Sequence, residues 1–405
     1  MQNANEIWVT GAGVITALGL GFEAHARAAS QGDSGLGRVE LFGGQAPDPV
    51  LCGRVPAPLL DPDLDATAAD RATRLLTLCL DDALHSAGLG AQARVEADLL
   101  VGTTAGNMHG GTRYYQALRS GQAPDLDLVR DFLPCAPAAR VARQAGLRGG
   151  VRTVCSACGS ASAALGQALA RLRAGRASRV IAGGFEALSP YVVAGFASLK
   201  LISAAPCRPF DADRDGLNPG EGAALLVLER AEDARRRGAR PLCRLAGHGE
   251  ALEAYHQTRA DPAGSGVAAA LGQALDDAGV APHELACLHL HGTATRANDL
   301  SEQRACETLF GPALARLPVC STKPMTGHTF GASGAVSAIF ALASLTHGLV
   351  PATLNLAALD PELSGLAASA APVALERPRH VACTTLGFGG EAFALVLSAV
   401  EQPHD

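Results

Sequence analysis

The order of predicted elements runs twice along the chain, once in each half. Residues 6–10 predict a strand that runs into the glycine turn Gly11-Ala12-Gly13, and residues 241–249 repeat this pattern. Residues 98–104 predict a buried strand that ends in a Gly-Thr turn, and residues 285–293 do the same. Strands and helices that alternate with this repetition predict a duplicated α/β fold with parallel strands.

A charged run at residues 229–237 marks the join between the two halves, residues 1–235 and residues 236–405. A chain of 405 residues can bury a large core, and because only 4% of residues are aromatic, Ala, Val and Leu must fill it. Residues 107–148 are polar and contain three prolines, which predicts an irregular excursion over a pocket or a subunit contact. Helices are predicted at residues 67–88, 266–278 and 329–347.

Composition and short motifs argue against several classes of protein. A net charge of −6 gives no electrostatic reason to expect a nucleic-acid partner. The 11 cysteines are irregularly spaced and odd in number, which argues against a disulfide framework and favours a reducing cytoplasm. Residues 1–6 lack the basic start of a signal peptide, and polar residues interrupt the apolar stretch 331–350, so we expect a buried helix rather than a membrane span. Thr16 stands where a dinucleotide-binding fingerprint needs its third glycine, which disfavours a Rossmann site.

Cys158 stands at a predicted strand-to-helix turn rich in small residues. Free N–H groups and the positive end of a helix dipole there favour the thiolate. One cysteine with distant histidines, His291 and His328, suggests acyl-thioester chemistry. A buried core thiol and structural histidines that cap glycine turns remain the alternatives. Cys155 and Cys158 also have the spacing of a redox or zinc motif, but no second pair accompanies them.

Further motifs occur in a characteristic order along the whole chain. They are the Cys158 turn, Ala182–Glu186, Pro206–Asp211, Gly220–Ala223, the His291 loop with Asn298-Asp299, Lys323–His328 and Gly387–Gly390. Because of these motifs the chain resembles the condensing-enzyme branch of the thiolase superfamily, and more narrowly the elongating β-ketoacyl-acyl-carrier-protein synthases. The resemblance implies thiolase-like halves of βαβαβαββ order, packed in five layers, α-β-α-β-α.

The resemblance implies a decarboxylative Claisen condensation without metal or cofactor. An acyl group is moved onto a cysteine, malonyl-carrier loses carbon dioxide, and the enolate attacks the acyl-cysteine. Two histidines favour the elongating type, because the initiating branch typically pairs one histidine with an asparagine. The residues implied are Cys158 as nucleophile, the backbone N–H groups of Cys158 and Phe388 for the oxyanion, His291 and His328 for the enolate, and a buried Lys323–Glu302 pair in support.

Partner and substrate contacts also follow from the resemblance. Relatives meet an acidic acyl carrier protein, and this fold usually buries one sheet edge across a two-fold, so we expect a homodimer or a heterodimer with a related subunit. The expected contacts with carrier or substrate are Arg71, Arg74, Arg208, Thr293, Thr295, Leu386 and Gly389.

Several positions depart from the family pattern. Gly159 replaces a hydroxyl residue, Glu391-Ala392 replaces Thr-Asn, and Leu386 replaces an aromatic residue at the acyl gate. The sequence around Phe185, Asn218–Glu221 and His291–Asp299 resembles that of specialised synthases that make polyenes, polyketides or other secondary lipids. Three alternatives stay open: a chain-length-determining partner subunit, which typically lacks the nucleophile, a non-decarboxylating thiolase or acyltransferase, and a carrier-binding scaffold whose acylated cysteine never turns over.

Overall fold

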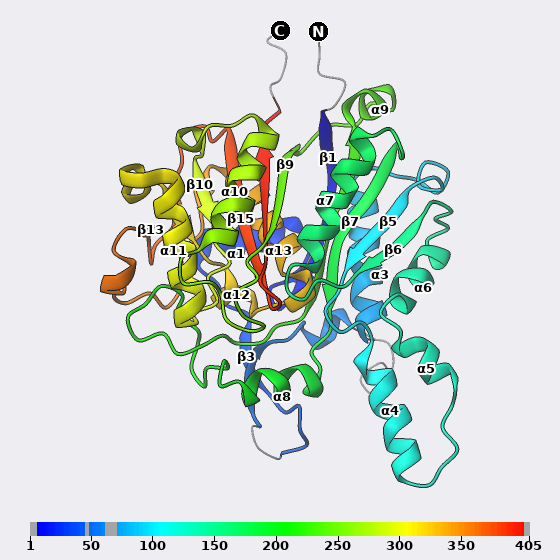
Figure 1. Ribbon diagram of the computed structural model, residues 1–405. Helices are drawn as coiled ribbons and strands as arrows, with labels where there is room; N and C mark the ends of the chain where they lie inside the picture. Colours follow the sequence, from blue (N-terminus) through cyan, green and yellow to red (C-terminus); the bar gives the residue numbers. More distant parts are fainter. Residues whose placement is uncertain (1–5, 45–47, 61–70, 401–405) are drawn as a thin grey trace.

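A computed structural model describes residues 6–44, 48–60 and 71–400. Its strands form two halves of one continuous sheet system (Figure 1). The first half has the order β1 (Ile7–Thr16), β8 (Gly222–Arg230), β7 (Arg179–Glu186), β5 (Asp98–Gly102), β6 (Val151–Val154). The second half has the order β9 (Cys243–Leu252), β16 (Glu391–Ser398), β15 (His380–Gly387), β10 (Cys287–His289), β11 (Pro318–Cys320), β13 (Ala367–Ala368).

The two halves share one pairing scheme. In each, the first strand pairs antiparallel with the last strand of that half, which pairs antiparallel with the strand before it, and the remaining pairs are parallel. The halves meet where β1 pairs with β9 over only two residue pairs. This repetition confirms the predicted duplicated α/β fold. The predicted division after residue 235 falls inside α9 (Ala231–Arg236) and stays a prediction.

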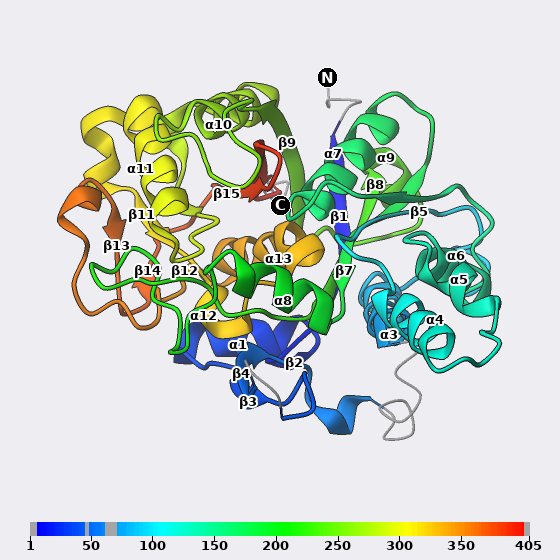
Figure 2. The same cartoon turned by 60° about the horizontal axis from the view of Figure 1, so that its bottom comes forward.

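Helices form the other three layers (Figure 2). Two helices lie between the sheets, and their side chains share one core with strands of both halves. The layers consist of α7 (Ser160–Arg173) and α13 (Ser333–His347) in the centre, α3 (Arg71–Ser86) and α6 (Ala136–Gln144) on one outer face, and α10 (Ser265–Ala278) and α11 (Arg296–Phe310) on the other. The five-layered α-β-α-β-α order is therefore as expected.

Helix α13 explains the apolar stretch near residue 340. Every residue from Ser333 to Leu345 is buried, which is typical of a helix packed on all sides. Within the described residues, Phe330–His347 is the one helical stretch long and apolar enough to cross a membrane, and 89% of it is buried inside the protein. The expectation of a buried helix is confirmed.

The sequence predicts turns at the glycine pairs of β1 and β9, but these glycines lie inside the strands. Strand β1 continues through Gly11 and Gly13 to Thr16. A Cβ on Gly13 would lie 2.2 Å from the carbonyl oxygen of Cys79 in α3, so the glycines let a helix approach the strand closely. Gly249 in β9 does the same for α10, where a Cβ would lie 2.0 Å from a backbone oxygen.

Residues 107–148 are largely helical, which corrects the predicted irregular excursion. The prolines lie between the helices or in a first helical turn, where they are tolerated. Helices α4 (Met108–Arg119) and α5 (Asp127–Phe132) project from the body of the molecule (Figure 1). The predicted helix at 67–88 is α3, with residues 67–70 outside the described residues, and the predicted helix at 266–278 is α10.

Shorter elements complete the chain. They include α1 (Phe22–Gln31), α8 (Pro190–Ser198), α12 (Lys323–Thr326), the hairpin β3 (Leu36–Val39) and β4 (Val50–Gly53), β2 (Gly19–Leu20), and the pair β12 (Leu349–Val350) and β14 (Val373–Ala374).

Candidate active site

The turn between β6 and α7 holds Cys158, as the sequence predicts. Ala157 takes a left-handed backbone conformation with φ of 44°, which turns the chain sharply just before the cysteine. The hydroxyl of Ser160 stabilises this turn by donating to the carbonyl oxygen of Ala157 at 2.7 Å and accepting from the backbone N–H of Ser156 at 2.8 Å. The Cys158 side chain is buried but borders a cavity.

Burial works against the expected preference of Cys158 for the thiolate. Burial raises the pKa of Cys158 to about 12, because a thiolate there would lose its hydration. Lys323 opposes the rise, whereas the carboxylates of Glu186 and Glu391 add to it. Desolvation therefore outweighs the nearby cation and the helix end, and a base is needed to take the thiol proton.

His328 places a ring nitrogen beside the Cys158 sulfur, where a base could accept the thiol proton. Its Nε2 atom lies 3.2 Å from the Cys158 sulfur. The backbone N–H of His328 donates to the carbonyl oxygen of Asn218 at 2.7 Å, and its carbonyl oxygen accepts from Gly220 at 2.8 Å. Burial and Lys323 hold the pKa of His328 well below its usual value, so the ring is neutral at pH 7.

His291 follows β10 and faces His328 edge-on, with ring centroids 5.1 Å apart and an interplanar angle of 84°. Burial, Lys323 and His328 lower its pKa well below the usual value. The Lys323 ammonium lies 3.3 Å from Nδ1 of His291 and also donates to the His291 backbone oxygen. Because an ammonium only donates, Nδ1 accepts and the ring proton sits on Nε2.

The expected direct pair between Lys323 and Glu302 is not observed, which corrects that expectation. Among the described residues, Lys323 bonds to His291, while burial lowers the lysine pKa to about 8 and the charge of Glu302 partly offsets that. Glu302 instead accepts from the backbone N–H groups of His291 and Gly292, each at 2.7 Å, and from the hydroxyl of Thr384 at 2.7 Å. The carboxylate therefore holds the His291 loop from its backbone, and the lysine holds the imidazole.

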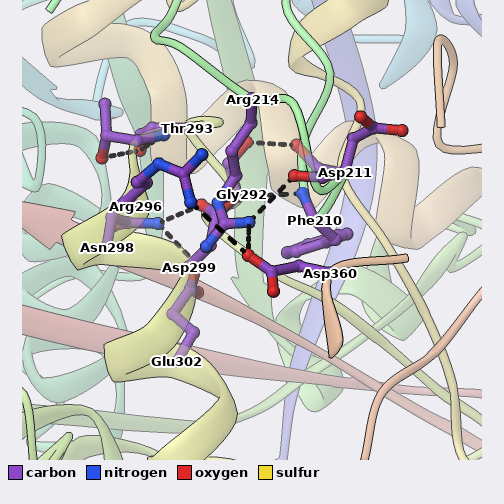
Figure 3. A network of polar contacts seen from close by, with 12 residues as sticks. Phe210, Asp211, Arg214, Gly292, Thr293, Arg296, Asn298, Asp299, Glu302 and Asp360 are labelled. Carbon is purple, nitrogen blue, oxygen red and sulfur yellow. Dashed lines mark hydrogen bonds and ion pairs between the residues drawn. The ribbon is translucent and has the colours of Figure 1, made fainter. Parts of the chain in front are cut away.

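A buried polar network extends from Glu302 to the 210–214 segment (Figure 3). The Asn298 amide donates to Glu302 at 2.9 Å and to Asp299 at 3.1 Å. Asp299 in turn accepts from the backbone N–H of Phe210 at 3.0 Å and lies 3.4 Å from the Arg214 guanidinium. Arg214 was missed by the sequence reasoning, although it follows the Pro206–Asp211 motif by three residues and is 1% exposed.

A cavity of about 370 Å³ lies in front of the cysteine and the two histidines. Cys158, His291 and His328 open onto it, and Phe388 at its wall stacks on Phe196 with ring centroids 5.2 Å apart. A Cβ on Gly387 would lie 3.4 Å from the backbone nitrogen of Gly159, so the Phe388 loop approaches the cysteine turn. Of the expected substrate contacts, the cavity lining includes Thr293, Thr295 and Leu386, together with Glu391. Gly389 is exposed and outside the lining.

The arginines expected to meet a carrier differ in their surroundings. Arg71 is 11% exposed and forms a buried ion pair with Glu221, its Nε donating at 2.8 Å, which favours a structural role for this residue over the expected surface contact. Arg74 and Arg208 are partly exposed, and each has a buried Nε that finds no hydrogen-bond partner among the described residues. Within the part of the chain that the structure describes, no group of three or more His, Cys, Asp or Glu side chains could hold a metal ion.

Comparisons with known proteins identify the family of this chain. The family model "Beta-ketoacyl synthase, N-terminal domain" matches residues 4–234, and "Beta-ketoacyl synthase, C-terminal domain" matches residues 242–357. The chain is 35% identical to "Putative polyketide beta-ketoacyl synthase 1" of Streptomyces cyaneus over 96% of this chain and 97% of that protein. It is 30% identical to "3-oxoacyl-[acyl-carrier-protein] synthase 2" of Staphylococcus aureus (strain COL), over 99% and 100%.

A solved structure, "The ishigamide ketosynthase/chain length factor", is similar with a TM-score of 0.91 and 29% identity over 98% of this chain and 100% of that one. Fold, site and comparisons lead to one conclusion: the chain belongs to the β-ketoacyl synthase family of condensing acyltransferases.

Proposed function

We propose that this protein extends a carrier-bound acyl chain by two carbons through Cys158, His291 and His328. The observation that carries the proposal is a buried thiol 3.2 Å from one neutral imidazole, with a second neutral imidazole at its edge, in a single cavity. A neutral imidazole can take the thiol proton and can donate N–H bonds to an enolate.

In the first half-reaction, Nε2 of His328 accepts the Cys158 proton while the sulfur attacks the acyl-carrier thioester. Backbone N–H groups of Cys158 and Phe388 stabilise the tetrahedral oxyanion, and the loss of one such donor typically costs ~3 kcal/mol of barrier. The intermediate collapses to acyl-cysteine, and the proton on His328 passes to the departing carrier thiolate. His328 is then neutral again.

For the second half-reaction the neutral ring of His328 moves its proton from Nδ1 to Nε2 by exchange with solvent. The malonyl thioester oxygen then lies against the Nε2 atoms of His291 and His328, each of which donates its proton in a hydrogen bond. Carbon dioxide leaves, and its electron pair forms the enolate that these bonds stabilise. The enolate carbon attacks the acyl-cysteine carbonyl, and the cysteine sulfur leaves as a thiolate that takes one proton from solvent. Lys323 and Glu302 keep His291 in place throughout.

We further propose an acyl carrier protein and a second ketosynthase-like subunit as partners, in a cytoplasmic dimer. Helices α4 and α5 expose large apolar side chains, and β6 is an edge strand of the sheet, so both would gain from burial. The second subunit is either a copy of this chain or a chain length factor, the kind of subunit that appears in the name of the ishigamide structure. The exposed apolar side chains include Tyr115, Leu118, Leu126, Val129, Phe132 and Leu133.

Particular residues of the site argue against the alternative functions. A chain-length-determining subunit needs no nucleophile, yet here Cys158 has a histidine in contact and a cavity in front of it. A non-decarboxylating thiolase uses a second cysteine where this chain has His328.

The test is a condensation assay with acyl-carrier and malonyl-carrier, in the presence and absence of candidate partner subunits. We expect β-ketoacyl-carrier and carbon dioxide from the wild type. His291→Ala should lower condensation by at least about 100-fold while Cys158 still accepts the acyl group. Acylation followed by no carbon dioxide release, with every partner tested, would contradict the proposal.

A further inference from the structure

Glu186 is a buried carboxylate to which the mechanism assigns no role. It ends β7 and is 0% exposed. Among the described residues no lysine, arginine or histidine forms an ion pair with it. Burial raises its pKa to about 7, and hydrogen bonds from the backbone oppose that rise. An unpaired carboxylate in this position is costly, so its contacts need an explanation.

The carboxylate binds donors from both halves of the chain. Thr104 and Ala105, in the loop after β5, donate their backbone N–H groups at 2.7 and 3.1 Å. Gly331, in the segment that follows His328, donates its N–H at 3.1 Å. These three backbone groups can only donate, so they favour the ionised carboxylate, whereas burial favours its neutral form.

The first of these loops supports the nucleophile turn. The Thr104 hydroxyl donates to the carbonyl oxygen of Ala157 at 3.1 Å, and the carbonyl oxygen of Thr103 accepts from the Ser160 hydroxyl at 3.2 Å. Ala157 is the residue with positive φ just before Cys158. A shift of the 103–105 loop would therefore move the sulfur.

The second segment supports the histidine. Gly331 follows Phe330, whose ring centroid lies 5.1 Å from that of His328. A Cβ on Gly331 would lie 2.3 Å from the backbone nitrogen of Thr104, so the two segments are in direct contact. Glu186 holds them together at this contact.

We propose that Glu186 is a positioning residue that fixes Cys158 relative to His328 by binding backbone amides on both sides. This inference rests on the proposed function of that pair. Glu186 is not part of the cavity lining, and its charge raises the pKa of Cys158. Its contribution is therefore geometric and works against its electrostatic effect on the thiol.

The test is a double-mutant cycle on the rate at which iodoacetamide alkylates Cys158. His328→Ala is compared in the wild type, in Glu186→Gln and in Glu229→Gln. Glu229 is also a fully buried carboxylate, but it pairs with Arg179 and Arg237. If Glu186 holds the histidine against the sulfur, His328→Ala should change the rate at least about fivefold in the wild type and Glu229→Gln, and less than about twofold in Glu186→Gln.

A second variant covers the case in which Glu186→Gln does not fold. Thr104→Val keeps the backbone N–H that Glu186 binds and removes only the hydroxyl that reaches Ala157. It should weaken the coupling in the same direction. An equal effect of His328→Ala in all backgrounds would overturn the inference.

Condensation provides a separate measurement. In Glu186→Gln we expect condensation to fall by about 10- to 100-fold through misplacement, whereas alkylation, which needs no aligned acyl group, should change by less than condensation does. Proportional loss of both rates with the folded fraction would overturn the inference. A wild type that does not condense contradicts the proposed function, but the alkylation cycle still decides the role of Glu186.

Discussion

Gly159 lies directly under the ring of Phe393, and this contact predicts an unusual response to a small substitution. The glycine has φ of −82° and ψ of −4°, a conformation that alanine adopts readily. Without a clash, glycine to alanine would stabilise the protein by about 0.4–1 kcal/mol. A Cβ at this position, however, would lie 2.1 Å from Cε2 and 2.4 Å from Cδ2 of Phe393.

Carbon atoms pack best at about 3.5–4.0 Å, so either the ring or the cysteine turn must move by roughly 1 Å or more. Phe393 is 5% exposed and has little room. Gly159→Ala should therefore cost about 1–3 kcal/mol of unfolding free energy, typical of overpacking. It should also slow acylation, because Cys158 is the adjacent residue.

The assay is denaturant unfolding of Gly159→Ala, Phe393→Ala and the double variant. Phe393→Ala alone should cost about 3–5 kcal/mol, and Gly159→Ala should add nothing further in that background. Gly195→Ala is a matched control, because Gly195 lies in α8 and a Cβ there would meet no atom within 4 Å among the described residues, apart from its chain neighbours and its own helix backbone. A destabilisation by Gly159→Ala that is equal with and without the ring would refute the reasoning, and so would no destabilisation at all.

The remaining predictions concern charges around the site. Arg71→Met should cost about 3–5 kcal/mol in unfolding free energy, because it leaves Glu221 buried without its cation, and carrier KM should not change; a selective rise in KM would restore Arg71 as a carrier contact. Glu391→Gln should lower the pKa of Cys158, so iodoacetamide alkylation at pH 8 should be faster than in the wild type; slower alkylation would contradict that. In the wild type the alkylation rate should keep rising beyond pH 9 without a plateau, because the thiol pKa is raised to about 12. A midpoint between pH 7 and 8 would show that the helix end and Lys323 outweigh burial.

The fold and the three central site residues could be predicted from the sequence, because both produce local sequence patterns. Repeated strand and glycine patterns predicted the duplication, and the motif order predicted that Cys158, His291 and His328 belong together. Prediction from the sequence failed where a residue's role depends on what packs against it. The sequence Gly11-Ala12-Gly13 is typical of a turn, yet Gly13 lies within a strand, where the absence of a Cβ lets helix α3 cross closely.

The roles of charged residues were harder to predict from the sequence than those of glycines, because the effect of a charge depends on its burial. Arg71 is on a helix face that the sequence cannot distinguish from the surface, and its partner Glu221 is 150 residues away. Glu302 was placed correctly near His291, but its bonds to backbone amides carry no sequence signal. The pKa of Cys158 depends on desolvation, which opposes the effect that the helix position alone suggested.

The most direct test of the account is intact-protein mass after incubation with a panel of acyl-carrier proteins, followed by peptide mapping. The account predicts one acyl adduct on the wild type, located at Cys158, absent from Cys158→Ala and discharged when malonyl-carrier is added. No adduct with any acyl group, or an equal adduct on Cys158→Ala, would contradict it.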